Sequence, residues 1–201
     1  GCDLLGLDRE IIVVESNSTD GTRELVERFA GTPGITLVWE DRPQGKGHAV
    51  LNGLRHATGD IIIIQDGDLE YDPADYARLI KPLADFQRAF VLGARSGRGF
   101  AMRTMQNQPV RSFYLNAGQL VFTGLLNLLC NTHLNDPWTM YKVFRRDALF
   151  NVVLHSHRFD FDWEIVTKLI RRGFVPEEIP ISYVSRSFRE GKKISPLRDP
   201  P

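Results

Sequence analysis

Residues 61–70 read IIIIQDGDLE, a wholly apolar run that ends in a cluster of carboxylates. Four isoleucines without alternation predict a strand covered on both faces, as in the parallel sheet of an α/β protein. Ligands bind at the open C-terminal ends of such strands. If the chain stays extended past Gln65, Asp66 and Asp68 point the same way, and paired carboxylates suit Mg²⁺ or Mn²⁺. The alternative is a plain polar turn, since Asp and Gly also form turns.

The segments around this stretch alternate between strand and helix patterns. Strands are predicted at residues 10–14, 35–39, 61–64, 90–94, 140–144 and 179–184. Helices are predicted through residues 25–29, at about 48–57, from residue 73 onward, and at 162–172. This order predicts an α/β domain in which helices flank a mainly parallel central sheet.

Length and charge limit the function. The chain of 201 residues fits one domain, residues 1–201, and its 25 Lys and Arg balance 25 Asp and Glu. Balanced charge gives no general attraction to polyanions, so we expect no nucleic-acid partner. Cys2 and Cys130 have no metal or redox spacing, which favours a reducing compartment. We therefore expect a cytoplasmic location, which includes the inner face of the membrane.

Residues 112–132 contain no Asp, Glu, Lys or Arg. The length of this segment approaches that of a membrane span. Four amide side chains interrupt it: Asn116, Gln119, Asn127 and Asn131. The segment therefore predicts a buried helix or a helix that lies on a membrane surface.

Residues 45–47, Gly-Lys-Gly, precede a predicted helix. A Walker sequence needs Gly where Glu40 stands and Ser or Thr where the second glycine stands, so a P-loop is excluded. Two interpretations remain: the backbone approaches a nucleotide with Lys46 nearby, or the segment is a plain loop with a solvated lysine. His155 and His157 have no evident third ligand, and we expect them on the surface.

Several stretches together resemble the family 2 glycosyltransferases of the GT-A fold, and within them the branch of dolichol-phosphate mannose synthase and its bacterial relatives. The stretches are residues 18–22 (STDGT), 45–47 (GKG), 66–70 (DGDLE), 136–142 (DPWTMYK), 161–165 (FDWEI), and Arg186 with 190–194 (EGKKI). One Asp-x-Asp alone is a weak signal. The ordered series spans nearly the whole chain and is far more specific.

The resemblance implies a site for a metal ion and a nucleotide sugar. The implied ligands of Mg²⁺ or Mn²⁺ are Asp66, Asp68 and Glu70. The implied nucleotide-sugar-binding residues are Glu15, Ser16, Lys46, Gly47, Asp66, Arg186 and Lys192. Glu15 stands where the family usually has an Asp that contacts the base, and Arg186 and Lys192 resemble the basic tail that closes over the diphosphate.

Asp162 and Asp136 are the catalytic candidates. By the resemblance, Asp162 matches the general base of polysaccharide-making relatives, and a sugar hydroxyl acceptor needs such a base. A lipid-phosphate acceptor is already anionic, so Asp162 would then be structural or orient the acceptor, while Arg103 or Arg111 would bind the phosphate. The alternative for Asp162 is an aspartate at the N-terminus of a helix, where it interacts favourably with the helix dipole. The alternative for Asp136 is a residue that caps a loop.

These residues predict an inverting, metal-dependent glycosyltransferase that moves a sugar from a nucleotide-diphosphate sugar to a lipid-phosphate or saccharide acceptor. A metal ion and cationic side chains stabilise the leaving diphosphate. A sugar nucleotidyltransferase is one alternative, although its Gly-rich N-terminal loop is not visible. A catalytically silent nucleotide-sugar-binding module is another, and the presence of Asp66, Asp68 and the basic tail argues against it.

The resemblance also implies that the chain is a segment. In the family a strand and a helix precede the stretch that matches residues 10–22, and only residues 1–9 stand before it here. A strand takes roughly 5 residues and a helix 10 or more. We therefore expect a domain that is truncated at the N-terminus and lacks the first strand of its sheet, with truncation at the C-terminus left open.

Overall fold

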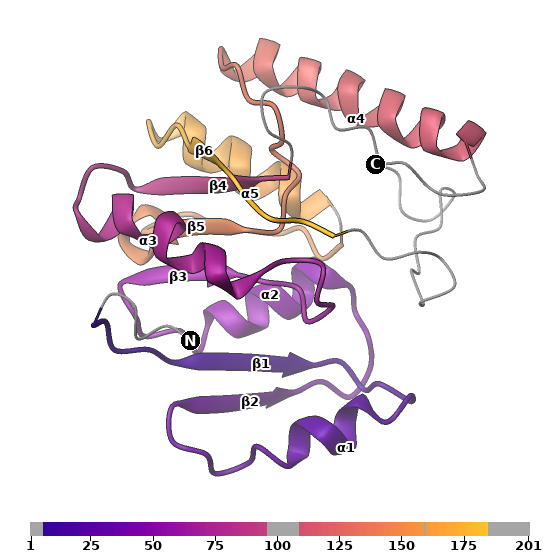
Figure 1. The fold of residues 1–201 in the computed structure, drawn as a ribbon, viewed down its shortest axis with the longest axis vertical. Coiled ribbons are helices and arrows are strands. Elements are labelled where there is room, and N and C mark those ends of the chain that lie inside the picture. The colour runs from indigo at the N-terminus through magenta and orange to yellow at the C-terminus, as the bar shows by residue number, and fades with distance from the viewer. Residues whose placement is uncertain (1–5, 96–108, 159, 185–201) are drawn as a thin grey trace.

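The computed structural model describes residues 6–95, 109–158 and 160–184 (Figure 1). The strands are β1 (Ile11–Glu15), β2 (Ile35–Trp39), β3 (Ile61–Ile64), β4 (Phe90–Ala94), β5 (Lys142–Arg145) and β6 (Glu177–Pro180). The helices are α1 (Thr22–Glu27), α2 (Lys46–Leu54), α3 (Tyr76–Ala84), α4 (Pro109–Cys130) and α5 (Asp160–Arg171), with short 3-10 turns η2 (Pro73–Asp75) and η3 (Arg146–Leu149). The predicted alternation of strands and helices is confirmed.

Two predicted strands have different bounds in the structure. β5 begins at Lys142, two residues later than predicted, because the N–H of Lys142 turns back to the carbonyl of Met140 (2.6 Å). β6 covers Glu177–Pro180 instead of 179–184, because its partner β4 ends at Ala94, whose carbonyl accepts from the N–H of Ile181 at 2.9 Å. Tyr183 beyond it still makes an isolated antiparallel bridge to Tyr71.

The strands form two sheets. β1 and β2 pair in parallel, with Ile11 opposite Ile35. The other sheet has the order β3-β5-β4-β6, in which β5 is antiparallel to both neighbours and β4 is parallel to β6. The sheet is therefore mixed, with β5 as the reversed strand. Among the described residues β1 and β3 share no ladder, and the further strand expected from the resemblance stays a prediction.

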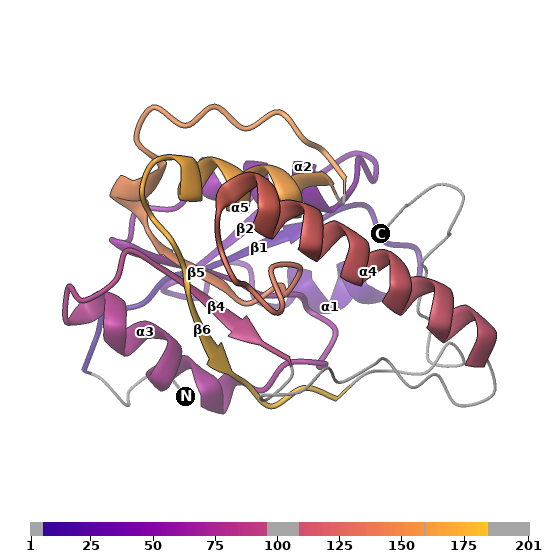
Figure 2. The ribbon, with the colours of Figure 1, turned by 90° about the horizontal axis from the view of Figure 1, so that it is seen from above.

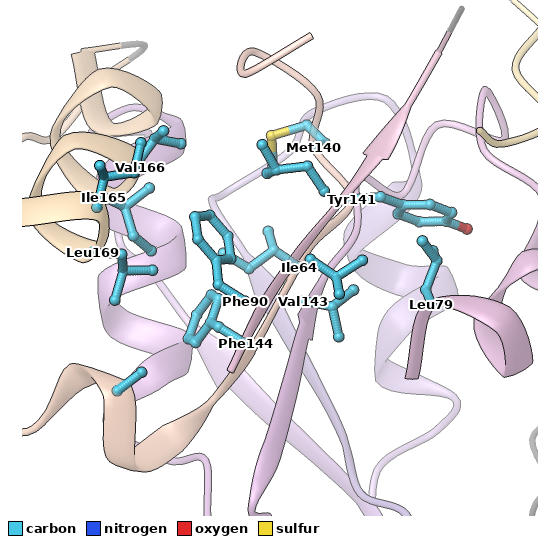
Figure 3. Packing of buried hydrophobic residues seen from close by; sticks show 14 of the residues in the cluster. Ile64, Leu79, Phe90, Met140, Tyr141, Val143, Phe144, Ile165, Val166 and Leu169 are labelled. Atoms are coloured by element: carbon cyan, nitrogen blue, oxygen red, sulfur yellow. The ribbon is translucent and has the colours of Figure 1, made fainter. Parts of the chain in front are cut away.

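The core lies around the four-stranded sheet. β4 is buried along its whole length, and the isoleucines of β3 are buried or partly buried, as the run without alternation predicts. Figure 3 shows Ile165, Val166 and Leu169 of α5 on one side of the strands and Leu79 of α3 on the other. Both faces of this sheet are therefore covered.

Helix α4 is the uncharged segment of the sequence, and it reaches beyond the sheet (Figures 1 and 2). Its inner face includes Asn116, Thr123 and Leu126, all buried. Its outer face exposes Leu120, Val121, Leu125, Leu128 and Leu129. No helix in the described part of the chain has the length and apolar character needed to cross a bilayer. The segment is therefore a half-buried helix with an exposed aliphatic face.

Candidate active site

Asp162 lies at the centre of the candidate site, in the first turn of α5. Lys142 Nζ on β5 donates to Asp162 Oδ1 at 2.6 Å, and Lys46 Nζ at the start of α2 donates to Asp162 Oδ2 at 3.0 Å. The Lys142 side chain is 0% exposed and that of Asp162 only 7%. Burial by itself would raise the pKa of Asp162, but the two ammonium groups hold it below its usual range. Burial lowers the pKa of Lys142, and the negative charge of Asp162 opposes this shift.

Asp66 follows β3 and has a different environment. Burial raises the pKa of its carboxyl, Asp68 and Asp162 raise it further, and the positive charges of Lys46 and Lys142 oppose the shift. No hydrogen bond or ion pair to Asp66 forms among the residues that the structure describes. A partly buried carboxylate that has no hydrogen-bond or ion-pair partner among the described residues is a ready ligand for a cation.

The three carboxylates expected to bind the metal do not form one cluster. Leu69 has φ 62°, so the extended path assumed for residues 66–70 ends there. Glu70 is buried and accepts a hydrogen bond from the Tyr183 hydroxyl (2.6 Å). Within the described ranges, no three His, Cys, Asp or Glu side chains gather as a metal site. Mg²⁺ needs only one or two carboxylates plus substrate phosphates, so Asp66 and Asp68 fit such an ion, and the role of Glu70 as a third ligand stays a prediction.

Residues 45–47 pack against another part of the protein. A Cβ on Gly47 would lie 2.6 Å from the Ser156 carbonyl oxygen, and one on Gly45 would lie 2.6 Å from that of His157. The N–H of His48 donates to the same His157 oxygen at 2.9 Å. The two glycines therefore permit close contact with residues 156–157, and this packing places Lys46 on Asp162. A role for Gly47 in donor binding stays a prediction, while His155 and His157 are exposed as expected.

Glu15 and Ser16 lie where β1 ends. Glu15 is 3% exposed and accepts hydrogen bonds from Ser18 N–H (2.6 Å) and Arg23 Nη1 (3.0 Å). Burial alone would raise the pKa of Glu15, but these and neighbouring hydrogen bonds lower it. Ser16 Oγ donates to the buried Glu40 (2.6 Å), which also lies 2.6 Å from His48 Nδ1. Glu15 thus holds its own loop in place, and its contact with a nucleotide base stays a prediction.

Asp136 is bound by Arg95, the residue that follows β4. Arg95 donates to it through Nε (2.8 Å), Nη2 (2.7 Å) and the backbone N–H (2.9 Å). Glu178 fixes the same loop by accepting from the Asp136 N–H at 2.6 Å. Burial would raise the pKa of Asp136, but Arg95 outweighs it and holds the pKa low. This geometry favours the loop-anchor interpretation of Asp136 over a catalytic one.

Sequence reasoning missed two charged residues of this region. Lys142 is the charged residue in the apolar segment 140–144, and Arg95 directly follows the apolar strand β4. The signal in the sequence was a charged residue within or directly after an otherwise apolar strand segment. Arg186, Lys192 and Arg103 lie outside the described residues, as does the side chain of Arg111 in α4.

Aromatic side chains join three elements beside Asp162. The rings of Trp138 and Trp163 stack at 5.5 Å with 21° between their planes, and Phe122 of α4 meets both edge-on. Trp138 Nε1 donates to Thr123 Oγ1 at 2.8 Å. The stack therefore connects α4 to the loop after Asp136 and to the first turn of α5.

The family profile described as "Glycosyl transferase family 2" matches residues 2–152, and the chain belongs to this family. The chain is 28% identical over 195 residues to undecaprenyl-phosphate 4-deoxy-4-formamido-L-arabinose transferase of Enterobacter sp. (strain 638), over 95% of this chain and 54% of that protein. It is 25% identical over 193 residues to the protein of the same description from Edwardsiella ictaluri (strain 93-146), over 95% of this chain and 55% of that protein. The chain thus spans about half the length of the curated relatives it matches.

Solved structures show the same fold. The mannosyltransferase PcManGT from Pyrobaculum calidifontis, in complex with GDP-Man and Mn²⁺, has a TM-score of 0.53 and 26% identity over 85% of this chain and 45% of that one. Glucosyl-3-phosphoglycerate synthase from Mycobacterium tuberculosis, with Mn²⁺, UDP-Glc and phosphoglyceric acid, has a TM-score of 0.60 and 19% identity over 89% and 62% of the two chains. The chain has the GT-A fold, as the resemblance implied.

Proposed function

We propose that this protein is an inverting, metal-dependent glycosyltransferase that takes a sugar from a nucleotide-diphosphate sugar. The observation that carries the proposal is Asp66, a carboxylate with raised pKa and no hydrogen-bond or ion-pair partner among the described residues, next to Asp68 and near Lys46. Asp66 and Asp68 are the residues that would hold Mg²⁺ or Mn²⁺, and the ion would supply positive charge to the leaving diphosphate. In the transfer an acceptor oxygen bonds to the anomeric carbon while the bond from that carbon to the diphosphate breaks.

The acceptor is a lipid phosphate or a saccharide hydroxyl. Membership of glycosyl transferase family 2 supports sugar transfer in general, and the curated relatives named above are described as undecaprenyl-phosphate transferases. Their name supports the lipid-phosphate acceptor for this chain. A lipid acceptor also requires the protein to act at a membrane surface. We expect this surface to be the cytoplasmic face.

The outer face of α4 is the proposed contact with that membrane. Its exposed side chains are aliphatic, with Leu128 80% and Val121 67% exposed, and residues 112–132 carry no charge. We expect the full-length protein to sediment with phosphatidylethanolamine–phosphatidylglycerol vesicles and the double variant Leu125→Gln, Leu128→Gln to do so several-fold less. Val153→Gln, at an exposed loop residue, is the control. Equal sedimentation of all three proteins would show that α4 does not contact the membrane.

Product analysis tests the reaction itself. The full-length protein is incubated with UDP-, GDP- and dTDP-sugars, with and without Mn²⁺. A transferase releases the nucleoside diphosphate when metal and acceptor are present. A sugar nucleotidyltransferase would release pyrophosphate, and a silent binding module would release neither.

Asp66→Asn and Asp68→Asn link the reaction to the metal. Each variant removes an anionic oxygen ligand, so we expect turnover at saturating Mn²⁺ to fall at least 100-fold while circular dichroism stays unchanged. Asp41→Asn, at an exposed position, should keep wild-type turnover. Retained turnover in the folded Asp66→Asn variant would exclude the metal assignment.

A further inference from the structure

Lys142 is a buried lysine that takes no part in the reaction as proposed above. It lies on β5 between the core residues Tyr141 and Val143, and its side chain is 0% exposed. Its ammonium group donates to Asp162 Oδ1 (2.6 Å) and also to the backbone carbonyl of Thr139. A buried ammonium group is strongly disfavoured unless it is paired and hydrogen-bonded, so this residue and Asp162 depend on each other.

The surroundings of Asp162 are poorly suited to a general base. Lys142 faces it from β5 and Lys46 from α2, and each ammonium group binds one carboxylate oxygen. Asp66, after β3, adds a further negative charge nearby. A general base must reach the substrate proton and be basic near the working pH. A carboxylate that is 7% exposed and neutralised by two cations meets neither requirement.

We propose that Asp162 and Lys142 form an ionic clamp that holds Lys46 in the active site, with Lys142 as a positioning residue and Asp162 not acting as a base. This inference rests on the proposed function and deepens it. Without a base, the acceptor oxygen must arrive already ionised, as a phosphate oxygen does. Its electron pair then forms the bond to the anomeric carbon, the pair of the broken bond leaves with the diphosphate, and no proton is transferred.

Variants that change the charge balance around Asp162 distinguish a role in an ionic clamp from a role as general base. Asp162→Asn leaves two lysines without their counter-charge, so transfer from the nucleotide sugar to farnesyl phosphate should fall at least tenfold. Adding Lys142→Gln removes one of those charges, and the double variant should recover at least tenfold over Asp162→Asn. If Asp162 were the base, the double variant would be no more active than the single one, and the proposal would be overturned.

The pH profile and the acceptor give independent readouts. The acidic limb of kcat/KM with farnesyl phosphate should be the same in the wild type and in Asp162→Asn, and farnesol should be at least 100-fold poorer than farnesyl phosphate. Loss of the acidic limb in the variant, or equal use of farnesol, would contradict the clamp. The exposed pair Lys81 and Asp85, 65% and 40% exposed, provides the control variants Lys81→Gln and Asp85→Asn.

Thermal unfolding keeps the inference testable if the reaction itself is wrong. Absence of nucleoside diphosphate release by the wild type with every donor would refute the proposed function alone. The clamp would still predict that the Tm loss of the Asp162→Asn, Lys142→Gln double variant is smaller than the sum of the two single losses. Lys81 and Asp85 also form an ion pair, but because it is exposed and screened by solvent, the losses there should be close to additive. Additive losses at Asp162 and Lys142 would overturn the clamp.

Discussion

The carboxylates of the site differ in what surrounds each of them. Asp162 and Asp136 are buried beside cations and their pKa values are lowered, whereas the pKa of Asp66 is raised by burial. The side chains are chemically identical, so the neighbouring residues decide which carboxylate stays ionised and paired and which remains available to a cation.

Asp66 should lower the stability of the metal-free protein. Its folded pKa is raised, so any stability from this group is present at low pH and is lost as the pH rises through that pKa. At pH 7 we expect Asp66→Asn to unfold at a higher temperature than the wild type in EDTA, because the variant removes a buried charge that disfavours the folded state. Mn²⁺ with nucleoside diphosphate should raise the Tm of the wild type and leave that of the variant unchanged. A lower Tm for Asp66→Asn in EDTA would contradict this account.

Glu164 should contribute stability that acid removes. It accepts hydrogen bonds from Lys168 Nζ (2.6 Å) and from the N–H groups of Ser156 (2.8 Å) and His155 (2.9 Å). Burial alone would raise its pKa, but these hydrogen bonds lower the pKa from 4.5 to about 2. The contribution is therefore complete above pH 4.5 and is lost as the pH falls toward 2.

We expect Glu164→Gln to lower the free energy of unfolding at pH 7 by about 1–3 kcal/mol. The difference from the wild type should shrink at pH 3.5, where part of the wild-type contribution is lost. Urea denaturation at both pH values measures it, with the exposed Glu27→Gln as the control. A difference that stays constant with pH would show that Glu164 acts only through packing.

At the scale of elements, close backbone contact brings the site together. α2 approaches residues 156–157 where Gly45 and Gly47 lack side chains, and this contact carries Lys46 to Asp162. The stacked rings of Trp138 and Trp163 connect α4 to α5. Helix positions, and not only the strand ends, thus determine the geometry around Asp162.

A pair of Gly→Ala substitutions in helices tests the contact of α2. In Gly47→Ala the new methyl group would lie 2.6 Å from the Ser156 oxygen and 2.8 Å from Phe161 Cβ, and we expect a loss of about 1–3 kcal/mol in the free energy of unfolding. Gly124→Ala in α4 meets no atom within 4 Å and should add about 0.5–1 kcal/mol through helix propensity. Denaturant titration of both variants measures these values. Equal effects of the same sign would show that the α2 contact does not limit stability.

At the scale of the whole molecule, the two-stranded part is less well covered than the four-stranded part. α1 has no buried residue, and its Leu25 is 54% exposed. β1 pairs with β2 on one edge, and within the described residues its other edge has no strand partner. Unpaired strand edges promote association with other chains.

β1 and β3 each have one edge without a strand partner among the described residues, so we propose that a longer form with an added strand, together with a helix and loops in about 40–50 further N-terminal residues, would be more stable. Such a strand would pair with the edges of β1 and β3 and join the two sheets into one. Thermal unfolding and calorimetry with UDP or GDP and Mn²⁺ on both forms test this, and the longer form should have the higher Tm and the tighter binding. An equal Tm and an equal affinity for the two forms would show that the edges of β1 and β3 limit neither stability nor binding.

Local patterns in the sequence were enough to predict the element order, the covered strand β3 and the place of Asp66 directly after it. The run of isoleucines and the carboxylates directly after it are adjacent in the chain, so local patterns were enough to predict β3 and to place Asp66 at its end. The motif order was likewise enough to indicate the family and the GT-A fold. The reversal of β5 was not predicted, because strand direction depends on how the chain returns to the sheet.

The partners of the charged residues became evident from the three-dimensional packing. Lys46 and Asp162 are 116 residues apart in the sequence, and Arg95 and Asp136 are 41 apart. The residues adjacent in sequence to either member of a pair do not indicate which residue it contacts. The charge state of a carboxylate depends on that contact and on burial. The sequence therefore indicated Asp162 and Asp136 as candidates for catalysis, and the structure shows that each carboxylate forms a buried ion pair.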